Sequence, residues 1–472
     1  MRIHKLVCAF FAIAFFASCS NDDEKQPSTF GKAETQLTET ETKILLSMRS
    51  DNNRVSIDEV MEQVNWVIDF LNGENALKSG VSRKVNFISA LVSGNAKAVA
   101  LKSSGFSDVE IPDTLAYVLN FADSLGFAIV SADTRIDDPL LAFTGSGSLA
   151  DSIDNPGVAI FLERLEDYML NSIAETEQQK DSLLAGILEK LDAEIDETRT
   201  KAGEEDNAVI RTEIINLISP LVPVEWGQGT PFNNNLGGQC YSRIDDKYPA
   251  GCVAVAVAQI MARWGYPYSI NGYSFNWTDL NKYTALSRRK AYPGAGDSSV
   301  LSAPDNVKNQ LANLFQQIGK GVSMNYGCGG SSSNIDNAVN FLSKQGFKTG
   351  GIIDYNSSAI ITSLNNKRPL IARGCSKKID HKFLGITVST SYDSCHVWVI
   401  DGYLKRRRFF GTRSSDVEHI HNNWGWSGMY DGYFAIGVFN SDLAHLDSNT
   451  GTKSSEPKNY QYQIKMAPNI YK

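Results

Sequence analysis

The segment from Tyr248 to Pro267 constrains the fold of this chain more than any other stretch. It contains a Pro-Ala-Gly turn, then Cys252, then an almost unbroken apolar run that ends at Trp264. The valines of this run alternate, so the pattern alone also suits a strand. Its length, its four alanines and the Gly and Pro that follow it favour a helix. We therefore predict a buried central helix whose first turn carries Cys252.

A thiol at the first turn of a helix lies in a distinctive electrostatic environment. The unpaired backbone N–H groups there favour an anion, and the thiolate is the nucleophilic form of cysteine. The common alternative is a cysteine that only fills space in the core as a small hydrophobe. The choice between the two depends on what the rest of the chain supplies.

The composition excludes several classes of function. The chain has 472 residues, enough for two or three domains, each with its own core. A charged fraction of 21% and a net charge of −8 describe an ordinary acidic protein and give no reason to expect a nucleic-acid partner. No Cys-x-x-Cys pair occurs, and no cysteines have the spacing of zinc ligands. We expect neither a metal ion nor another cofactor.

The N-terminus has the features of an export signal. Two basic residues precede an apolar run that is too short to span a bilayer, which indicates a signal peptide over residues 1–18. Cys19 follows Phe-Ala-Ser, an arrangement similar to the bacterial lipobox, in which the cysteine is acylated. Residues 19–41 are polar and indicate a tether. We expect a bacterial outer-membrane surface lipoprotein, held only by its N-terminal lipid, or plain secretion.

Two regions of different texture follow the tether. In the first, apolar spacing predicts an amphipathic helix, three strands and a long helical stretch. These elements span residues 56–71, 115–121, 126–132, 140–144 and 158–197. A polar stretch near residues 198–207 then predicts a domain boundary, and its Arg199 and Lys201 make it cleavable. The expected domains are residues 42–205 and 206–472.

The second region has short elements separated by loops rich in Gly, Asn and aromatic residues, as expected where loops carry function. It predicts two short helices and three strands, over residues 336–345, 360–366, 369–372, 397–400 and 432–436. The basic run from Lys405 to Arg408 has two interpretations, a solvated loop or a contact for an anionic substrate.

A cysteine nucleophile needs a base within hydrogen-bond reach, and the base needs a third group that fixes its ring. Of the six histidines, His396 opens the predicted strand 397–400, which would hold it rigidly. The other histidines beyond the leader lie in polar sequence, where exposed rings are the ordinary expectation: His381, His419, His421 and His445. His396 is therefore the candidate base.

The segment Asn422–Gly428 supplies the candidate third group. The amide of Asn423 can accept a hydrogen bond from an imidazole without adding charge, and the adjacent indole of Trp424 can keep water off that bond. The alternative is a turn capped by aromatic residues. Upstream, the side-chain amide of Gln228 and the N–H of the nucleophile would form an oxyanion hole worth roughly 3 kcal/mol. Most Gln side chains are only solvated surface groups.

Four ordered blocks of this sequence resemble the streptopain family of bacterial cysteine peptidases. They are Trp226–Gln228, Ala250–Pro267, His396–Tyr403 and Asn423–Phe434. Residues 126–132 also resemble the propeptide of that family, so the likeness runs from about residue 40 to the C-terminus. The resemblance implies a zymogen of the α+β class, in which an inhibitory α+β prodomain precedes a papain-like peptidase domain.

The resemblance also implies endopeptidase activity on proteins and peptides, with the prodomain as the enzyme's own inhibitor. It makes Cys252 the nucleophile, His396 the base and acid, and Asn423 the orienting residue. Gln228 would be the oxyanion donor, and Trp424 would shield the site.

The sequence departs from the family pattern beside the candidate base. The residue before that histidine is usually Gly and here is Cys395, which could form a disulfide with Cys375. Residues 376–393 look longer than the family's loop, so substrate preference is the property that transfers least. Five cysteines follow the leader, and an odd count leaves at least one thiol free or intermolecular.

Other functions remain open at this point. A surface adhesion or glycan-binding lipoprotein would use exposed aromatic residues such as Trp424 and Trp426 and would need no activated cysteine. A papain-like amidase or transglutaminase would use the same three residues as a peptidase. Labelling by a thiol-directed epoxide separates the first alternative, and product analysis separates the second.

Overall fold

A computed structural model describes residues 37–73, 83–92, 114–149, 152–153, 155–198, 211–241, 245–284, 298–375, 382–383, 386–388, 395–410, 413–440 and 464–472. The helices are α2 (Glu39–Ser47), α3 (Ile57–Asn72), α5 (Pro156–Thr198), α6 (Cys252–Trp264), α7 (Trp277–Leu280), α8 (Asp305–Gly321), α9 (Ile335–Lys344) and α10 (Ser357–Asn365), with 3₁₀ turns η1 (Ala122–Ser124), η2 (Val300–Ser302) and η3 (Ile436–Phe439). Among the helices of these ranges, none is both long enough and apolar enough to cross a membrane.

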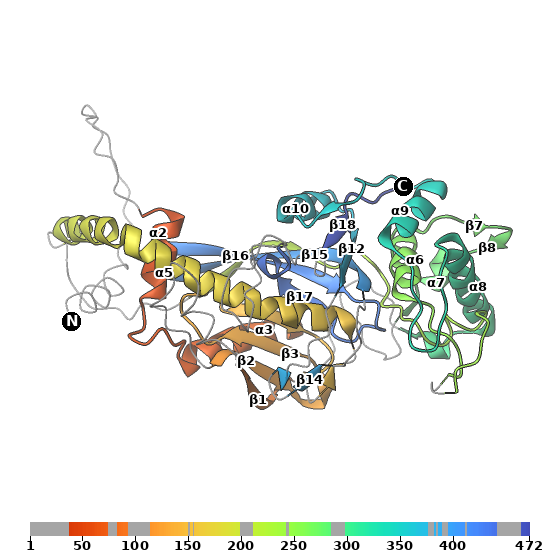
Figure 1. The fold of residues 1–472 in the computed structure, drawn as a ribbon, viewed down its shortest axis with the longest axis horizontal. Coiled ribbons are helices and arrows are strands. Elements are labelled where there is room, and N and C mark those ends of the chain that lie inside the picture. Colours follow the sequence, from red (N-terminus) through yellow and green to blue (C-terminus); the bar gives the residue numbers. More distant parts are fainter. Residues whose placement is uncertain are drawn as a thin grey trace, which may run out of the picture.

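One large sheet forms the middle of the molecule (Figure 1), in the order β1-β2-β3-β4-β17-β16-β15-β12-β18-β11, with β6 also paired to β15. Its strands are β1 (Val85–Val92), β2 (Thr114–Phe121), β3 (Phe127–Ser131), β4 (Leu140–Thr144), β6 (Arg211–Ile218), β11 (Ile353–Asp354), β12 (Leu370–Cys375), β15 (Cys395–Phe410), β16 (Arg413–Asn423), β17 (Gly432–Ala435) and β18 (Lys465–Ala467). Its pairings are antiparallel, so the fold is of the α+β class.

Three small sheets complete the described strands. Two are the pairs β7 (Ser269–Ile270) with β8 (Tyr273–Ser274), and β9 (Tyr283–Thr284) with β10 (Ser298–Ser299). The third joins β13 (Lys382–Phe383), β14 (Ile386–Val388) and β5 (Ser152–Ile153). This last sheet pairs β14, which lies between β12 and β15 in the chain, with β5, which lies just before α5.

Helices cover both faces of the N-terminal part of the sheet because its side chains alternate. In β2, Val118 belongs to the same core cluster as Phe161 of α5, whereas its neighbour Leu119 belongs to the cluster of Val64 on α3. The long helix α5 runs across the sheet (Figure 1). The amphipathic helix, the three strands and the long helical stretch predicted for this region are confirmed, with small shifts of their ends.

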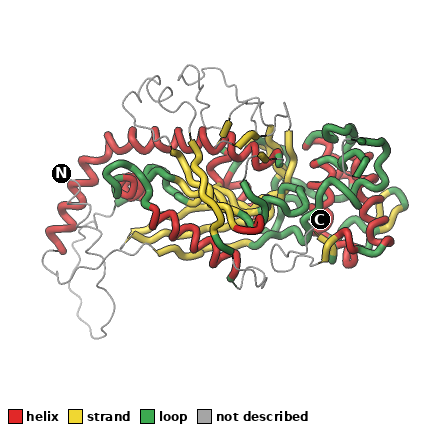
Figure 2. The backbone as a smooth tube through the Cα atoms, turned by 90° about the horizontal axis from the view of Figure 1, so that it is seen from below, coloured by secondary structure: helices red, strands yellow, loops and turns green. Residues whose placement is uncertain are grey.

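A second lobe of helices and loops lies at one end of the sheet and holds the C-terminus (Figure 2). Its core forms around α6, whose apolar residues pack with α8 and α9. Successive side chains of β15 point to opposite faces of the sheet, which puts this lobe on the face away from α5. Val397 and Val399 pack with α6, whereas Trp398 and Ile400 belong to the cluster of α5. The elements predicted for residues 206–472 are confirmed in α9, α10, β12, β15 and β17.

The two predicted domains share one sheet. Strand β4 of the N-terminal region pairs with β17 of the C-terminal region, and Phe143 lies opposite Tyr433 with their rings stacked 5.3 Å apart. The predicted boundary near residues 198–207 falls largely outside the described residues, as does Cys19. The sequence suggested two separate units, but the backbone hydrogen bonds make the sheet continuous across them.

The basic run from Lys405 to Arg408 lies within strand β15, so its side chains alternate between two faces. Arg406 and Arg408 are buried and form ion pairs with Asp138 at 2.9 Å and with Glu59 at 3.1 Å. The other two cations point to the opposite face and pair with carboxylates of β16. The prediction of a solvated loop is wrong, because the run lies in a strand and two of its cations are buried against acids of the N-terminal region.

Candidate active site

Helix α6 begins at Cys252, as the sequence predicts. Gly251 before it has a φ of 89° and leaves no room for a side chain, because a Cβ there would lie 2.6 Å from the sulfur of Met324. The helix ends at Gly265, which adopts the left-handed conformation common at C-termini. These two glycines set where the helix starts and stops, and so place the thiol at its first turn.

Burial dominates the electrostatics of the Cys252 thiol. Desolvation raises its pKa, while the backbone N–H groups of Val397, Val253 and Cys252 itself act in the opposite direction and favour the thiolate. The helix start thus favours the thiolate as the sequence suggested, but burial outweighs it and the pKa of Cys252 is raised. Cys252 is the free cysteine of the part of the chain that the structure describes.

His396 is buried near the start of β15, next to the residue whose backbone meets the thiol. Its Nε2 lies 2.8 Å from the carbonyl oxygen of Trp424. A carbonyl can only accept, so Nε2 carries the proton and Nδ1 is left as the basic nitrogen. Burial lowers the pKa of His396 to about 4. The chain segments of Cys252 and His396 meet, yet no hydrogen bond or ion pair between the two side chains is present among the described contacts.

The described hydrogen bonds of Asn423 go to groups other than the ring of His396. Its Oδ1 accepts hydrogen bonds from Nε2 of Gln259 at 2.8 Å and from the backbone N–H of Gly425 at 3.2 Å. Its Nδ2 donates to the carbonyl of Val224 at 3.0 Å. The carbonyl of the next residue takes the predicted place of the Asn423 amide, and a backbone acceptor has no signature in a sequence.

Trp424 is fully buried beside these groups. Its indole N–H donates to the carbonyl of Tyr430, and its ring centroid lies 5.2 Å from that of Trp398 and 6.5 Å from that of His396. On the remaining side it meets Gly157, at the start of α5. The buried ring of Trp424 therefore packs beside the ring of His396.

Gln228 lies on the loop beside the turn that leads into α6. Its backbone carbonyl accepts a hydrogen bond from the N–H of Ala250 at 2.9 Å, two residues before Cys252. Its side chain is half-buried. The structure thus brings the backbone of Gln228 beside the loop that precedes the thiol.

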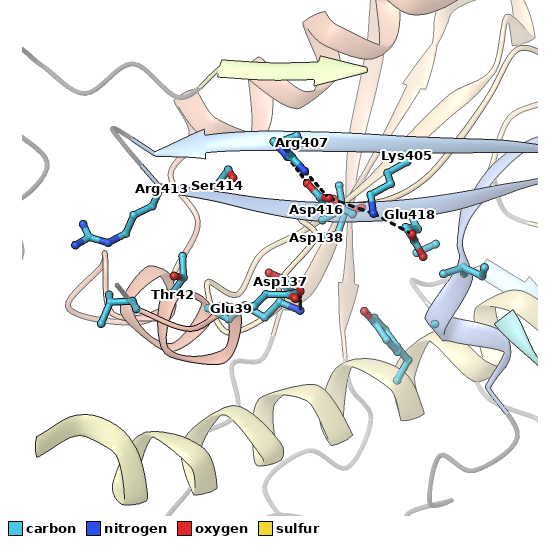
Figure 3. Close-up of a pocket in the computed structure, with 17 residues that line it drawn as sticks. Glu39, Thr42, Asp137, Asp138, Lys405, Arg407, Arg413, Ser414, Asp416 and Glu418 are labelled. Carbon is cyan, nitrogen blue, oxygen red and sulfur yellow. Dashed lines mark hydrogen bonds and ion pairs between the residues drawn. The ribbon is translucent and has the colours of Figure 1, made fainter. Parts of the chain in front are cut away.

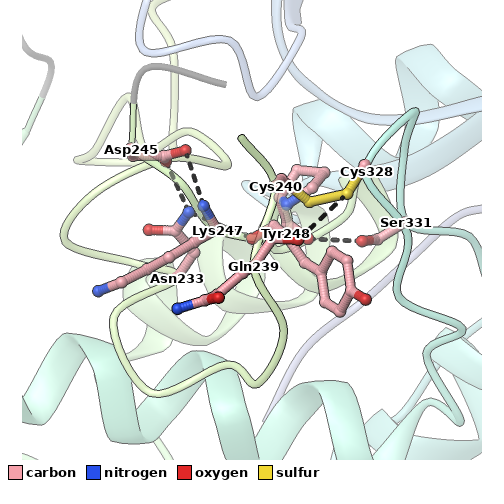
Figure 4. Close-up of a disulfide and its surroundings, with 9 residues drawn as sticks. Asn233, Gln239, Cys240, Asp245, Lys247, Tyr248, Cys328 and Ser331 are labelled. Atoms are coloured by element: carbon pink, nitrogen blue, oxygen red, sulfur yellow. Dashed lines mark hydrogen bonds between the residues drawn. A yellow bond between two sulfur atoms is a disulfide. The ribbon is translucent and has the colours of Figure 1, made fainter. Parts of the chain in front are cut away.

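A disulfide supports the same turn (Figure 4). Cys240 is bonded to Cys328, and nearby Ser331 donates a hydrogen bond to the carbonyl of Pro249 at 2.6 Å. The loop that carries Ser331 is thereby held against the residues that precede the thiol. The second disulfide, between Cys375 and Cys395, confirms the predicted pair beside His396.

Two histidines and three acids missed by the sequence reasoning are buried in this part of the sheet. His419 and His421 lie in β16, not in exposed loops; His381 and His445 lie outside the described residues. Nδ1 of His421 lies 2.7 Å from Asp401, and Asp431 accepts a hydrogen bond from the N–H of Trp424 at 2.8 Å. The only apolar residues of β16 are Val417 and Ile420, three residues apart, so no alternation in the sequence indicates that these histidines are buried.

Glu225 belongs to this buried acidic group. Burial and the charge of Asp401 raise the pKa of Glu225 to about 8. Burial and the nearby Glu225 also raise the pKa of Asp431 well above its usual range. Glu225 is therefore largely protonated at neutral pH, and the segment behind Trp424 carries less negative charge than its sequence indicates. In the described residues we find no group of three or more side chains suited to hold a metal ion.

The cavity shown in Figure 3 lies elsewhere, with a volume of about 820 Å³. Charged residues of α2, β15 and β16 line it, among them Glu39, Lys405, Arg407 and Asp416. None of the five predicted residues of the active site reaches it. Its walls mix both signs of charge, and most of its cations already pair with acids beside them.

The sequence matches a known peptidase family where these residues lie. Residues 226–434 match the family model described as "Peptidase C10 family", and that range includes Cys252, His396, Asn423 and Gln228. Streptopain of Streptococcus pyogenes is 26% identical over 367 residues, which are 72% of this chain and 79% of streptopain. The chain is a cysteine peptidase similar to the streptopain family. It is therefore an enzyme that hydrolyses peptide bonds with a cysteine nucleophile.

Other relatives and solved structures share parts of this likeness. The thiol protease/hemagglutinin PrtT of Porphyromonas gingivalis is 23% identical over 374 residues, 74% of this chain and 37% of that protein. A prointerpain A fragment of Prevotella intermedia is 18% identical and covers 77% of this chain and 98% of its own, with a TM-score of 0.46. Active interpain A is 19% identical and covers 55% and 97%, with a TM-score of 0.36.

Proposed function

We propose that the protein is a latent endopeptidase in which Cys252 is the nucleophile and His396 is the base and acid. The position of the thiol carries this proposal: Cys252 opens α6 and lies against the backbone of Val397, which follows His396 directly. The hydrogen bond from Nε2 of His396 to Trp424 supports it, because the tautomer it selects leaves Nδ1 free to accept a proton.

The reaction proceeds in two stages. Nδ1 of His396 takes the thiol proton, and the sulfur of Cys252 attacks the peptide carbonyl carbon. Gln228 and the N–H of Cys252 donate to the oxyanion. The imidazolium then protonates the leaving amine as the C–N bond breaks. Water, deprotonated by His396, attacks the thioester and releases the carboxylic acid and the free thiol.

Residues 42–205 act as an inhibitory prodomain in this proposal. Gly157 of that region lies against Trp424, and β4 extends the sheet of the peptidase region at β17. In the full-length chain, burial raises the pKa of the Cys252 thiol and lowers that of His396. Both shifts favour the uncharged pair over thiolate and imidazolium, so the covered site is inactive near neutral pH.

Export completes the proposal. The signal over residues 1–18 would direct secretion, and acylation of Cys19 would hold the mature protein on the outer membrane surface through the tether 19–41. Mass spectrometry of the N-terminal peptide from membrane fractions tests this. A free or acetylated N-terminus beyond residue 19 would contradict lipidation.

The first experiment measures casein cleavage and thiol labelling of the activated enzyme. Cys252→Ala abolishes both cleavage and labelling by a thiol-directed epoxide, because no other free thiol is present in the described residues. Asp336→Ala, an exposed change on α9, serves as the control and keeps both. Cleavage that survives Cys252→Ala would refute the proposed nucleophile.

A second experiment tests latency. The full-length chain is expected to show little cleavage of casein until it is trimmed near Arg199 to Arg211, after which activity rises. The released N-terminal region should then inhibit the trimmed enzyme when added back. Equal activity before and after trimming would show that residues 42–205 do not inhibit.

A further inference from the structure

The four cations near the end of β15 differ in where their partners lie. Lys405 and Arg407 pair with Asp416 of the neighbouring strand β16, at 3.1 Å and 2.6 Å (Figure 3). These pairs lie within the peptidase region and survive removal of the N-terminal region. Arg406 and Arg408, on the other face of the strand, form their ion pairs with acids of the N-terminal region. Trimming therefore breaks the ion pairs of one face only.

Arg406 is fully buried among groups of the N-terminal region. Its Nη2 lies 2.9 Å from Oδ1 of Asp138, and its Nη1 donates to Oε1 of Gln63 at 3.2 Å. Its guanidinium lies 4.6 Å from the centroid of the Trp66 ring. A carboxylate, an amide oxygen and an aromatic face are groups that bind arginine wherever proteins recognise it. The N-terminal region thus treats this side chain as a ligand.

Arg408 repeats this arrangement two residues further along β15. Its Nη2 lies 3.1 Å from Oε1 of Glu59, and its Nη1 donates to the carbonyl oxygen of Asp137 at 3.3 Å. Residues two apart on a strand point to the same face and lie about 6.6 Å apart. Two carboxylates, from Glu59 and Asp138, therefore match two guanidinium groups at the spacing of alternate residues in a strand.

Apolar side chains lie beside the two arginines. Leu404 and Tyr433 are buried in a cluster whose other described buried members lie in residues 55–143. Removal of the N-terminal region would uncover both side chains together with the cations. Arginine and tyrosine around an apolar centre are typical of residues that dominate protein interfaces. The four residues Leu404, Arg406, Arg408 and Tyr433 form the uncovered face of the trimmed enzyme.

We propose that the uncovered face is a docking site for an extended acidic segment of a protein substrate. The proposal rests on the proposed function. An extended segment with Asp or Glu at alternate positions presents its carboxylates about 6.6 Å apart on one side, the spacing of Arg406 and Arg408. Each carboxylate can pair with one guanidinium through charge-assisted hydrogen bonds, as Asp138 and Glu59 do in the full-length chain.

The position of the uncovered face on β15 favours a substrate as its occupant. His396 lies near the start of the same strand, ten residues before Arg406. The two are therefore about 33 Å apart along the strand. Trimming would make the proposed catalytic residues and the uncovered face available in one event. A substrate held at this face keeps the rest of its chain within reach of His396.

The first experiment measures binding of a fluorescein-labelled peptide of alternating Glu and Ser. The full-length Cys252→Ala chain is folded, trimmed by trypsin near Arg199 to Arg211 and freed of the N-terminal region, so the probe stays intact. The acidic peptide is expected to bind about tenfold or more tightly than its Gln-Ser analogue, and less tightly as salt rises. The untrimmed chain should not bind it, because Asp138 and Glu59 occupy the arginines.

Three variants of the same chain locate the binding. Arg406→Gln and Arg408→Gln should each weaken binding of the acidic peptide about fivefold, the value of one exposed ion pair. Arg407→Gln is the matched control, because it removes the same charge from the opposite face of the same strand and should leave the affinity unchanged. If Arg406→Gln does not fold as a full-length chain, Arg408→Gln and the comparison before and after trimming decide the question.

The second experiment measures cleavage by the activated wild-type enzyme. One peptide substrate is joined through a Gly/Ser linker to either the Glu-Ser or the Gln-Ser segment. A linker of about 30 residues has a root-mean-square length of about 30 Å, comparable to the distance along β15. The acidic substrate should have a KM several-fold lower with kcat unchanged, because docking binds the ground state and the transition state equally. Arg408→Gln should reduce this difference, and Arg407→Gln should not.

Three outcomes would overturn the docking site. They are equal affinity of the trimmed chain for the two peptides, acidic binding that neither Arg406→Gln nor Arg408→Gln weakens, and a trimmed enzyme that covers this face in a stable dimer with a second copy. Cleavage of both substrates with equal KM would refute docking alone. An activated wild-type enzyme that cleaves neither substrate would refute the proposed function, whatever the binding experiment shows.

Discussion

Gly157 at the start of α5 lies flat against the ring of Trp424, and no side chain fits between them. A Cβ on Gly157 would lie 2.1 Å from Cε3 of Trp424, far inside van der Waals contact. The N-terminal region thus reaches the most buried aromatic ring of the proposed site with its smallest residue. Close packing of this kind makes the covered state sensitive to a single methyl group.

Replacing Gly157 with Ala is expected to weaken the contact between the N-terminal region and the site. Overpacking of this size costs about 1–3 kcal/mol. The full-length variant should therefore cleave casein before trimming, at a rate several-fold above that of the untrimmed wild type. Gly186→Ala on the same helix is the control, because nothing lies within 4 Å of a Cβ there. Equal latency in the two variants would contradict the packing argument.

Replacing Arg406 with Ala should destabilise the full-length chain strongly. The change leaves the carboxylate of Asp138 buried without the cation that lies 2.9 Å from it, and also removes the guanidinium from above the Trp66 ring. Breaking a buried ion pair from one side costs about 3–5 kcal/mol. Urea unfolding of the full-length chain measures this. Arg407→Ala, one residue on and on the solvent face, should change the midpoint little; a similar loss in both would disprove the burial argument.

Acid should destabilise the full-length chain through His419. Its Nε2 lies 2.6 Å from the carbonyl of Leu140 and near Asp138, while Arg406 faces it as well. Burial lowers the pKa of His419 to about 4, so the folded state binds this proton less readily than the unfolded chain. The stabilisation is complete above the unfolded pKa of about 6.5 and is lost as the pH falls toward 4. At pH 5 the loss is about 2 kcal/mol.

Urea unfolding of the full-length chain at pH 7.5 and pH 5 measures this acid effect. His419→Gln cannot take up a proton, so its free energy of unfolding should change less between the two pH values than that of the wild type. An identical change in both proteins would show that His419 contributes nothing to acid sensitivity.

The two disulfides should contribute unequally to stability. Cys240 and Cys328 are 88 residues apart in the chain, whereas Cys375 and Cys395 are 20 apart. The chain-entropy model therefore predicts that removing the longer link costs about 1 kcal/mol more than removing the shorter one. Thermal unfolding of the Cys→Ser pairs under oxidising conditions tests this. A smaller loss for the longer link would mean that strain or denatured-state structure governs the effect.

The position of Cys252 could be predicted because local signals agree there. An alanine-rich apolar run bounded by glycines specifies a buried helix with few alternatives, and α6 begins and ends where those signals lie. The same holds for α3, whose apolar spacing repeats every three to four residues, and for the short alternating strands β2 to β4. Elements with a strong period of their own need no distant partner to be recognised.

The buried cations of β15 and the hydrogen-bond partners of Asn423 could not be predicted in the same way. A run of four basic residues shows no apolar alternation. The acid that pairs with the buried Arg408 is Glu59, almost 350 residues earlier in the chain. Asn423 was placed against His396 on the assumption of a side-chain acceptor. The acceptor is a backbone carbonyl, and every residue has one, so only the geometry of the fold distinguishes it.

The ladder between β4 and β17 has a consequence for how activity would appear with time. A cut in the segment between α5 and β6 breaks one covalent bond but leaves the backbone pairs around Phe143 and Tyr433 in place. Such a nicked chain is expected to stay inactive until β4 separates from β17. The onset of proteolysis should therefore lag behind the nick, with a delay set by strand separation and shortened by mild denaturant.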